Sequence, residues 1–490
     1  PGNETLRGTT VDYLSEFAAE GGKVIFAGTE PAYVDAKKSS WVKELAERCV
    51  RVPFGKVDIL DALEAYRELE IRRPDGSLAE EFLYQMREAD SETWLFIANG
   101  KKAATQDVPR QEIYEIRLRG CYQAEVLDTQ TGEVLSCAAV VRNGRTVIRK
   151  VLDLHDSLLL KLTPVTVPEE TENVTEALVK TTGERKTVPE PEAFSLEEPN
   201  VLLLDQCEYR FDGGSWQEKE EILRIDSCLR ERLGYAKRME EWPQPWVTEE
   251  EAGEKHQIEL RFSFYSEQDF EDVLLALEGL EDSEIIWNGE KVSKEPKGWF
   301  ADECIRKISL GWVRQGVNQL LVRRPFGKKT NLEWYYLLGR FGVRTAGRDA
   351  YLAAFPEKLR FGDYCSQGFP FYAGNLLYET EISVEEAGEY GIQISKFRAP
   401  LLKVSIDGGE WKPIAYAPYE VNTGYLEKGV HRLRIRSFGN RVNAFGAVHD
   451  CDETAVWFGP NEWRTEKERY SYEYQLKRMG VLKSPVIYKK

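Results

Sequence analysis

Four residues combine flat aromatic rings with hydrogen-bonding groups in a pattern that could contact a sugar. Glu333, Trp334 and Tyr335 are consecutive within the aromatic stretch 331–343, and Trp299 precedes a phenylalanine in an earlier segment. Aromatic rings offer flat apolar faces that can stack on a sugar ring, and a carboxylate accepts strong hydrogen bonds. We therefore predict these four as carbohydrate-binding residues. The alternative is core packing between two sandwiches, because Trp and Tyr are commonly buried with one polar handle.

Two histidine motifs contain the residue types of catalytic or metal sites without the required geometry. His155-Asp156-Ser157 has the three residue types of a serine hydrolase, yet neighbours on a strand point to opposite faces. His449-Asp450-Cys451-Asp452 offers metal-ligand types, but the segment has no second histidine. We predict structural roles for both motifs, the second as a surface turn, and we predict no metal site and no cofactor.

The composition argues against several classes of protein. The 490 residues include 66 basic and 83 acidic side chains, which gives a net charge of −17. Binding to nucleic acid or to an anionic membrane needs a basic surface, so we predict neither partner. No window approaches the ~18 consecutive apolar residues of a membrane helix. The 8 cysteines form no C-x-x-C pair and there are only 4 histidines, which favours a reduced, cytoplasmic setting, although a targeting segment could precede Pro1.

The chain begins with a pattern that predicts a short α/β segment. A helical stripe that starts near Thr9 is followed by Gly21-Gly22 and by the apolar run at 23–28. This order is typical of a helix and then a buried parallel strand. Because one good parallel strand is too few for a doubly wound sheet, we expect further strands upstream of Pro1.

The rest of the chain predicts a mainly β, multidomain protein. Apolar residues alternate with period two, Asn-Gly and Asp-Gly pairs mark tight turns, and one amphipathic helix is expected around 218–233. We expect a partial α/β domain at 1–76, a small antiparallel β-sandwich at 77–165, a linker or wrapping segment at 166–199, a jelly roll with a helical insertion at 200–346, and a second β-sandwich or jelly roll at 347–490.

Three sequence motifs in the middle of the chain resemble those of a known family. They are the hairpin Trp287-Asn288-Gly289-Glu290, the segment Gly298-Trp299-Phe300, and Gly316-Val317-Asn318-Gln319-Leu320, in this order. With them, residues 257–345 resemble the galactose-binding-type jelly roll of family 2 glycoside hydrolases. Residues 4–36 resemble the flavodoxin- or glutaminase-like α/β domain that follows the barrel in β-galactosidases and family 106 rhamnosidase-like enzymes, and 77–162 resemble the small β domain after it.

The resemblance implies that the chain corresponds to the C-terminal, post-barrel half of a large glycoside hydrolase of the family 106 type. Catalytic carboxylates of that family lie on the barrel, and no stretch here shows the eight alternating strands and helices of one. A glycosidase needs two carboxyl groups roughly 5–10 Å apart, and the sequence does not single out a pair, so we predict no catalytic residue.

The implied role is an accessory region that supports an upstream catalytic barrel and contacts glycans containing rhamnose or galactose. Its expected partners are carbohydrate and that barrel. The alternatives are a stand-alone carbohydrate-binding protein and a structural scaffold without hydrolase activity. The parent protein would be an O-glycosyl hydrolase, whereas the activity of this chain itself stays open.

Overall fold

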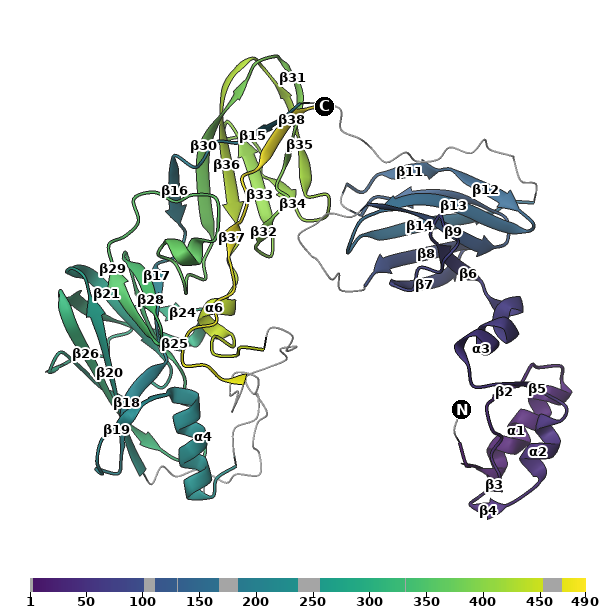
Figure 1. The fold of residues 1–490 in the computed structure, drawn as a ribbon, viewed down its shortest axis with the longest axis horizontal. Helices are drawn as coiled ribbons and strands as arrows, with labels where there is room; N and C mark the ends of the chain where they lie inside the picture. Colours follow the sequence, from purple (N-terminus) through teal and green to yellow (C-terminus); the bar gives the residue numbers. More distant parts are fainter. Residues whose placement is uncertain are drawn as a thin grey trace. The chain divides into compact units, whose positions relative to one another are not determined.

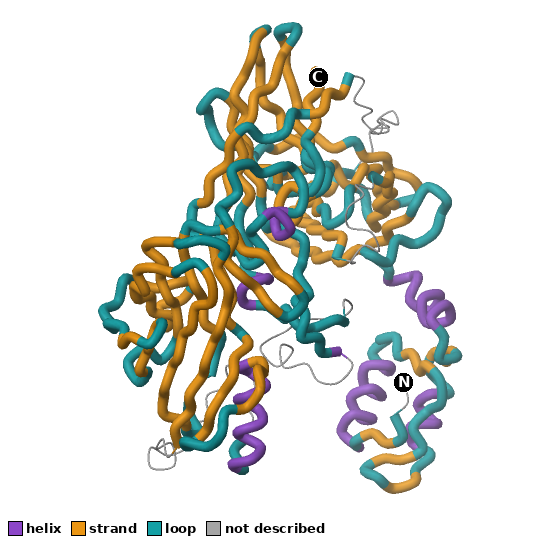
Figure 2. The backbone as a smooth tube through the Cα atoms, turned by 60° about the vertical axis from the view of Figure 1, so that its left-hand side comes forward, coloured by secondary structure: helices purple, strands orange, loops and turns teal. Residues whose placement is uncertain are grey.

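The computed structural model describes residues 3–100, 111–129, 131–166, 184–236, 256–330, 332–452 and 469–490. The described residues up to 166 belong to one compact unit and those from 184 onward belong to a second. Strands dominate both units, and the few helices lie mainly at the start of the chain (Figures 1 and 2). The expectation of a mainly β, multidomain protein is therefore confirmed.

The first unit opens with a small α/β segment. Its helices are α1 (Gly8–Ala19), α2 (Trp41–Ala46) and α3 (Lys56–Leu63), followed by the 3-10 turn η1 (Glu64–Tyr66). The strands β2 (Ile25–Ala27) and β5 (Val50–Val52) pair in parallel, and β1 (Thr5–Leu6), β3 (Tyr33–Val34) and β4 (Lys37–Lys38) form a second small sheet. The predicted helix and the predicted parallel strand are both present.

A β-sandwich completes the first unit. One sheet has the order β11 (Val134–Cys137), β10 (Tyr122–Leu127), β14 (Ser157–Pro164), β8 (Glu92–Asn99), β7 (Phe82–Ala89), and the other has the order β12 (Ala139–Arg142), β13 (Arg145–Leu152), β9 (Glu112–Arg119), β6 (Leu69–Arg72). Strand β6 lies before the expected boundary at residue 77. It belongs to the sandwich because it pairs with β9 and buries Leu69 and Ile71 in the core.

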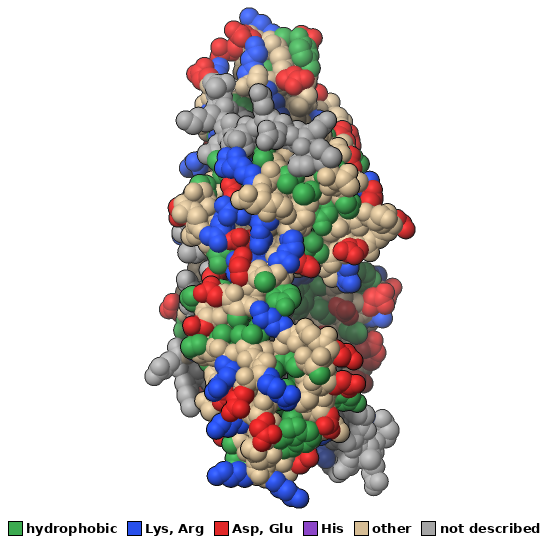
Figure 3. Space-filling model, turned by 90° about the vertical axis from the view of Figure 1, so that its right-hand side faces the viewer, with side chains coloured by type: hydrophobic (Ala, Val, Ile, Leu, Met, Phe, Trp, Pro, Cys, Tyr) green, Lys and Arg blue, Asp and Glu red, His purple; other side chains and the backbone are tan. Residues whose placement is uncertain are grey.

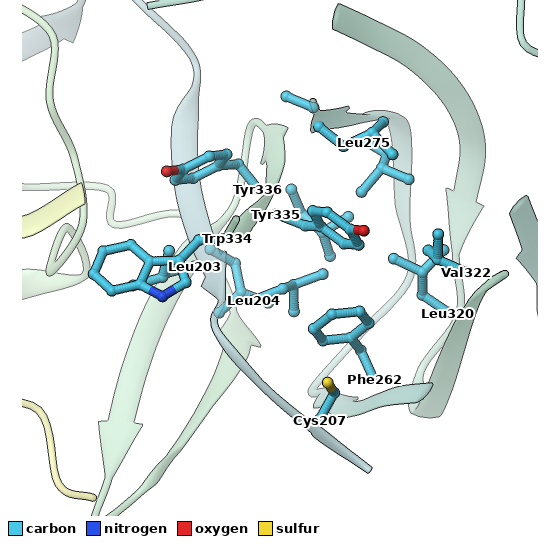
Figure 4. Close-up of a cluster of buried hydrophobic side chains, with 14 of the residues drawn as sticks. Leu203, Leu204, Cys207, Phe262, Leu275, Leu320, Val322, Trp334, Tyr335 and Tyr336 are labelled. Carbon is cyan, nitrogen blue, oxygen red and sulfur yellow. The ribbon is translucent and has the colours of Figure 1, made fainter. Parts of the chain in front are cut away.

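The second unit contains the jelly roll. Its first sheet has the order β17 (Asn200–Leu204), β27 (Tyr335–Gly339), β21 (Phe270–Leu277), β25 (Asp302–Val313), β24 (Trp299–Phe300). Its second sheet contains β19 (Gln217–Glu221), β18 (Gln206–Phe211), β20 (His256–Ser266), β26 (Gly316–Phe326), β22 (Glu284–Trp287), β23 (Glu290–Lys291), β28 (Gly342–Ala346) and β29 (Asp349–Ala353). The predicted helix is α4 (Ile222–Leu233), which ends at Gly234 with φ 69°. Apolar side chains of the two sheets meet in one core (Figure 4).

The two Asn motifs of the jelly roll lie side by side. Asn288 and Gly289 have φ angles of 48° and 87°, as the two-residue hairpin between β22 and β23 requires. Asn288 Nδ2 donates to Asn318 Oδ1 at 2.9 Å, and Asn288 Oδ1 accepts from the Gln319 backbone N–H at 2.8 Å. The hairpin is therefore tied to the start of β26 by side-chain hydrogen bonds.

A second sandwich follows in the same unit. One sheet has the order β15 (Arg185–Thr187), β38 (Val486–Lys489), β31 (Gly388–Gln393), β35 (Glu420–Leu426), and the other has the order β16 (Ala193–Leu196), β30 (Leu376–Val384), β36 (Gly429–Ser437), β33 (Leu402–Ile406), β34 (Lys412–Ile414). The short strands β32 (Phe397–Arg398) and β37 (Gly480–Val481) pair with each other, η2 (Tyr364–Gln367) precedes β30, and α6 (Val442–Phe445) follows β36.

Strand pairing also places the expected domain boundaries differently at two points. In the segment 166–199, residues 167–183 lie outside the described part, and β15 and β16 are strands of the second sandwich. Strand β29 lies beyond residue 347 but pairs with β28 and β20 of the jelly roll. Long-range backbone pairing, which local sequence does not report, decides both points.

The surface of the described residues carries charges of both signs. On the face drawn in Figure 3, basic and acidic side chains are interspersed with hydrophobic ones. Within the described ranges, no helix combines the length and the hydropathy needed to cross a bilayer.

Candidate functional site

The structure separates the four predicted carbohydrate-binding residues into two groups. Trp334 is 3% exposed and Tyr335 is 0% exposed. Tyr335 begins β27, which has a neighbouring strand on each side in the first jelly-roll sheet, and Trp334 directly precedes that strand and packs in the same core. Tyr335 points into the core, where its ring centroid lies 5.2 Å from that of Phe262, whereas the side chain of Trp334, just before the strand, points in another direction (Figure 4). Core packing, the alternative considered for this stretch, therefore replaces sugar stacking as the interpretation of Trp334 and Tyr335.

Trp299 is accessible to a ligand. Its side chain is 48% exposed on β24, the edge strand of the same sheet. Glu333, which directly precedes the buried pair, is partly buried, and its charge helps burial to raise the pKa of Tyr336 well above the usual value. Asn331, at the start of the aromatic stretch, lies outside the described residues. Trp299 is thus the one aromatic residue of the predicted set that is available for stacking.

A buried ion pair joins the jelly roll to the C-terminal segment. Asp205, at the end of β17, is 1% exposed, and its Oδ2 lies 2.5 Å from Nε2 of His449, which is 2% exposed. Asp205 Oδ1 accepts a hydrogen bond from the Tyr474 hydroxyl at 2.7 Å. His449 Nδ1 lies 2.8 Å from the backbone oxygen of Ser471. The prediction of a surface turn at His449 was wrong, because the ring lies inside the protein.

The partners of His449 define its charge. A carbonyl oxygen can only accept a hydrogen bond, so Nδ1 donates to Ser471, and Nε2 is the nitrogen that faces Asp205. An ionised Asp205 can only accept, so with that carboxylate both ring nitrogens carry a proton and the ring is an imidazolium cation. Burial by itself lowers the pKa of His449, but the hydrogen bond and the charge of Asp205 raise it above its usual value. The pair is a neutral unit inside the domain.

Glu221 forms the second buried polar centre beside this pair. It is 1% exposed and accepts hydrogen bonds from the backbone N–H groups of Leu223 and Arg224, both at 3.0 Å, at the start of α4. Its Oε1 also accepts from Trp334 Nε1 at 2.6 Å. Burial, with a further contribution from the charge of Asp205, raises the pKa of Glu221 to about 7, although the hydrogen bonds and His449 act in the opposite direction. Glu221 can therefore gain or lose a proton near neutral pH.

Sequence reasoning did not identify this network. Asp205 and His449 are 244 positions apart, and Glu221 lies in the polar run Gln217–Glu221, where a carboxylate usually indicates an exposed surface. Glutamate is also not among the preferred residues at a helix N-terminus. The isolated histidine after α6 was the only local signal. In the described residues, the structure places no group of three His, Cys, Asp or Glu side chains that could hold a metal ion.

No protein family matches the chain, and no curated protein sequence matches it. Among solved structures, it is similar to a rhamnosidase from Novosphingobium sp. PP1Y, with a TM-score of 0.42 and 11% identity, over 99% of this chain and 33% of that chain. An apo exo-carrageenase GH42 from Bacteroides ovatus gives a TM-score of 0.23 and 13% identity, over 33% of this chain and 21% of that chain. A GH2 beta-galacturonidase from Eisenbergiella tayi gives a TM-score of 0.17 and 11% identity, over 49% of this chain and 36% of that chain. The chain spans about a third of the length of the rhamnosidase.

Proposed function

We propose that this chain is a non-catalytic accessory region of a glycoside hydrolase, which contacts carbohydrate and supports a catalytic barrel. The observation that carries the proposal is the exposed ring of Trp299 on the edge of a jelly roll. The hydrogen-bonded Asn288 and Asn318 motifs, which resemble those of family 2 sugar-binding domains, belong to the same jelly roll. The glycans that we propose for it contain rhamnose or galactose.

The described strands also favour a supporting role over catalysis. Their sheets are built almost entirely from antiparallel pairs, with parallel pairing between β1 and β3, between β2 and β5, and at one position between β20 and β29. A catalytic (βα)8 barrel needs eight parallel strands, and the described residues do not form one. The catalytic carboxylates that we propose for the whole enzyme therefore lie outside this chain.

The experiment compares glycan binding of the parent chain with that of Trp299→Ala. Trp312→Ala is the matched control, because Trp312 is 45% exposed on the neighbouring strand β25. Loss of a stacking ring should weaken binding to rhamnose- or galactose-containing oligosaccharides by about tenfold or more, equal to ~1.4 kcal/mol, while the unfolding temperature stays unchanged. Trp312→Ala should bind as the parent does.

Two results would contradict the proposal. Binding that does not depend on Trp299, or a parent chain that binds no glycan, would leave the scaffold alternative. Release of product from aryl rhamnosides or galactosides by the purified chain, abolished by changing one of its carboxylates, would show that the chain is itself a catalyst.

A further inference from the structure

A groove opens in the second jelly-roll sheet where β20 changes its pairing partner. Strand β18 pairs with Ile258–Arg261 of β20, and β29 pairs with β20 only at Ser266. Between these partners, residues 262–265 of β20 form the floor of a cavity of about 310 Å³. We name this cavity the β20 groove; the residues that line it include Ser263, Tyr265, Gln206, Lys219, Arg348 and Tyr351. The volume is at the low end of ligand pockets and suits a single small ring.

The floor of the β20 groove differs from the rest of the same sheet face. Toward the other end of β20, the outward side chains form ion pairs across the strands, namely Arg261 with Glu208, Arg210 with Glu259, Arg323 with Glu259, and Arg323 with Glu284. On the floor of the groove, the outward residues of β20 and β26 are uncharged. Tyr265 is 49% exposed, and Val317, its partner on the neighbouring strand, is 77% exposed. An exposed aromatic ring in a concavity is a common feature of ligand sites.

Arg348 lies in the groove wall in a fixed position. Its Nε donates to Gln206 Oε1 at 3.1 Å, and its Nη2 donates to the backbone oxygen of Lys219 at 2.9 Å. The guanidinium lies 4.5 Å from the centre of the Tyr472 ring. Gln206 is only 6% exposed and donates in turn to the backbone oxygens of Arg348 and Tyr472. The guanidinium is therefore oriented before any ligand arrives.

The charges around the groove leave Arg348 as the uncompensated group. Lys219 forms an ion pair with Asp349 at 2.5 Å, and Asp205, at the rear of the cavity, is neutralised by His449. Arg348 contacts neutral acceptors and a ring, and among the described residues no carboxylate pairs with it. Arginine prefers planar carboxylates, which it can bind with two parallel hydrogen bonds. A ligand with a carboxylate would supply the missing partner.

We propose that the β20 groove binds a uronic acid residue of a glycan, with the carboxylate at Arg348 and the sugar ring against Tyr265. The cavity volume limits the ligand to about one ring, the exposed tyrosine provides a stacking face, and Arg348 provides the charge. The proposal rests on the proposed function in that the ligand is a carbohydrate, but the groove residues are separate from Trp299.

The test uses the purified chain and isothermal titration with methyl galacturonide, methyl galactoside and acetate as probes. Methyl galacturonide should bind at least tenfold more tightly than the other two. Arg348→Gln should weaken its binding by about tenfold or more, because the variant loses the charge-assisted hydrogen bonds to the carboxylate. Arg344→Gln is the matched control, since Arg344, which lies on β28, forms an ion pair with Glu267 and does not line the groove.

A second variant guards against misfolding of the first. Ser263→Trp should fill the groove from its exposed floor and abolish galacturonide binding without a change in unfolding temperature. Equal binding of galactoside and galacturonide, equal binding of acetate, or galacturonide binding that survives Ser263→Trp would overturn the proposal, as would failure of the parent to bind galacturonide. If Trp299→Ala still weakens oligosaccharide binding in that case, the proposed function stands and only the groove assignment fails.

Discussion

The sharpest prediction concerns the proton on Glu221. In the folded protein the pKa of this carboxyl is about 7, compared with 4.5 for an ordinary glutamate. Below pH ~4.5 the group is protonated in both the folded and the unfolded chain, so its contribution to stability is fully present. As the pH rises toward 7, the unfolded chain loses its proton first, and the free energy of unfolding falls.

The size of this effect follows from the shift. Each pKa unit corresponds to about 1.36 kcal/mol, so a rise from 4.5 to about 7 gives a loss of roughly 3 kcal/mol between pH 4.5 and pH 7. The pKa of His449 is also raised, which adds stability below pH ~6.5 that is lost as the pH rises through its folded pKa. Both groups act in the same direction.

The perturbation is Glu221→Gln, which removes the titration but keeps an oxygen that can accept from Trp334. Urea titrations followed by indole fluorescence, at intervals from pH 4.5 to pH 7.5, give the free energy of unfolding of the parent and of the variant. The stability of the parent relative to the variant should fall by roughly 3 kcal/mol across this interval. Glu218→Gln, at an exposed position of the same strand, is the control and should show no comparable trend.

A relative stability that stays flat, or that rises with pH, would refute the reasoning. Either outcome would mean that Glu221 is ionised in the folded protein at neutral pH. The hydrogen bonds from Leu223, Arg224 and Trp334 would then outweigh the cost of burial.

Two further predictions concern stability. Trp334→Ala should lower the free energy of unfolding by roughly 3–5 kcal/mol in urea titrations, because the ring is 3% exposed. Trp299→Ala should change the free energy of unfolding by less than ~0.5 kcal/mol. Similar values for the two variants would contradict the assignment of one ring as buried and the other as exposed. His449→Leu should cost roughly 3–5 kcal/mol because it leaves Asp205 buried without its partner, and adding Asp205→Asn should recover part of that loss. If Asp205→Asn lowers the free energy of unfolding as much in the His449→Leu variant as in the parent, the result would argue against the ion pair.

The local sequence determined the elements of this protein where neighbouring residues decide the structure. Outward and inward residues alternate along β20, so period-two hydrophobicity was sufficient to predict a strand. Asn143, Asn288 and Asp407 have φ angles of 50°, 48° and 50°, which explains why Asn-Gly and Asp-Gly pairs marked the turns correctly. The mainly β class and the positions of α1 and α4 could therefore be predicted.

Tertiary structure alone decided which side chains are buried and which meet. Trp299 lies on the edge strand β24 and its ring is exposed, whereas Trp334 directly precedes β27 and its ring is buried in the core, where it donates to Glu221. Asp205 and His449 meet because β17 ends where the segment after α6 packs, a contact between residues 244 positions apart. Strand order and long-range packing set these contacts, and neither leaves a signal in the neighbouring residues.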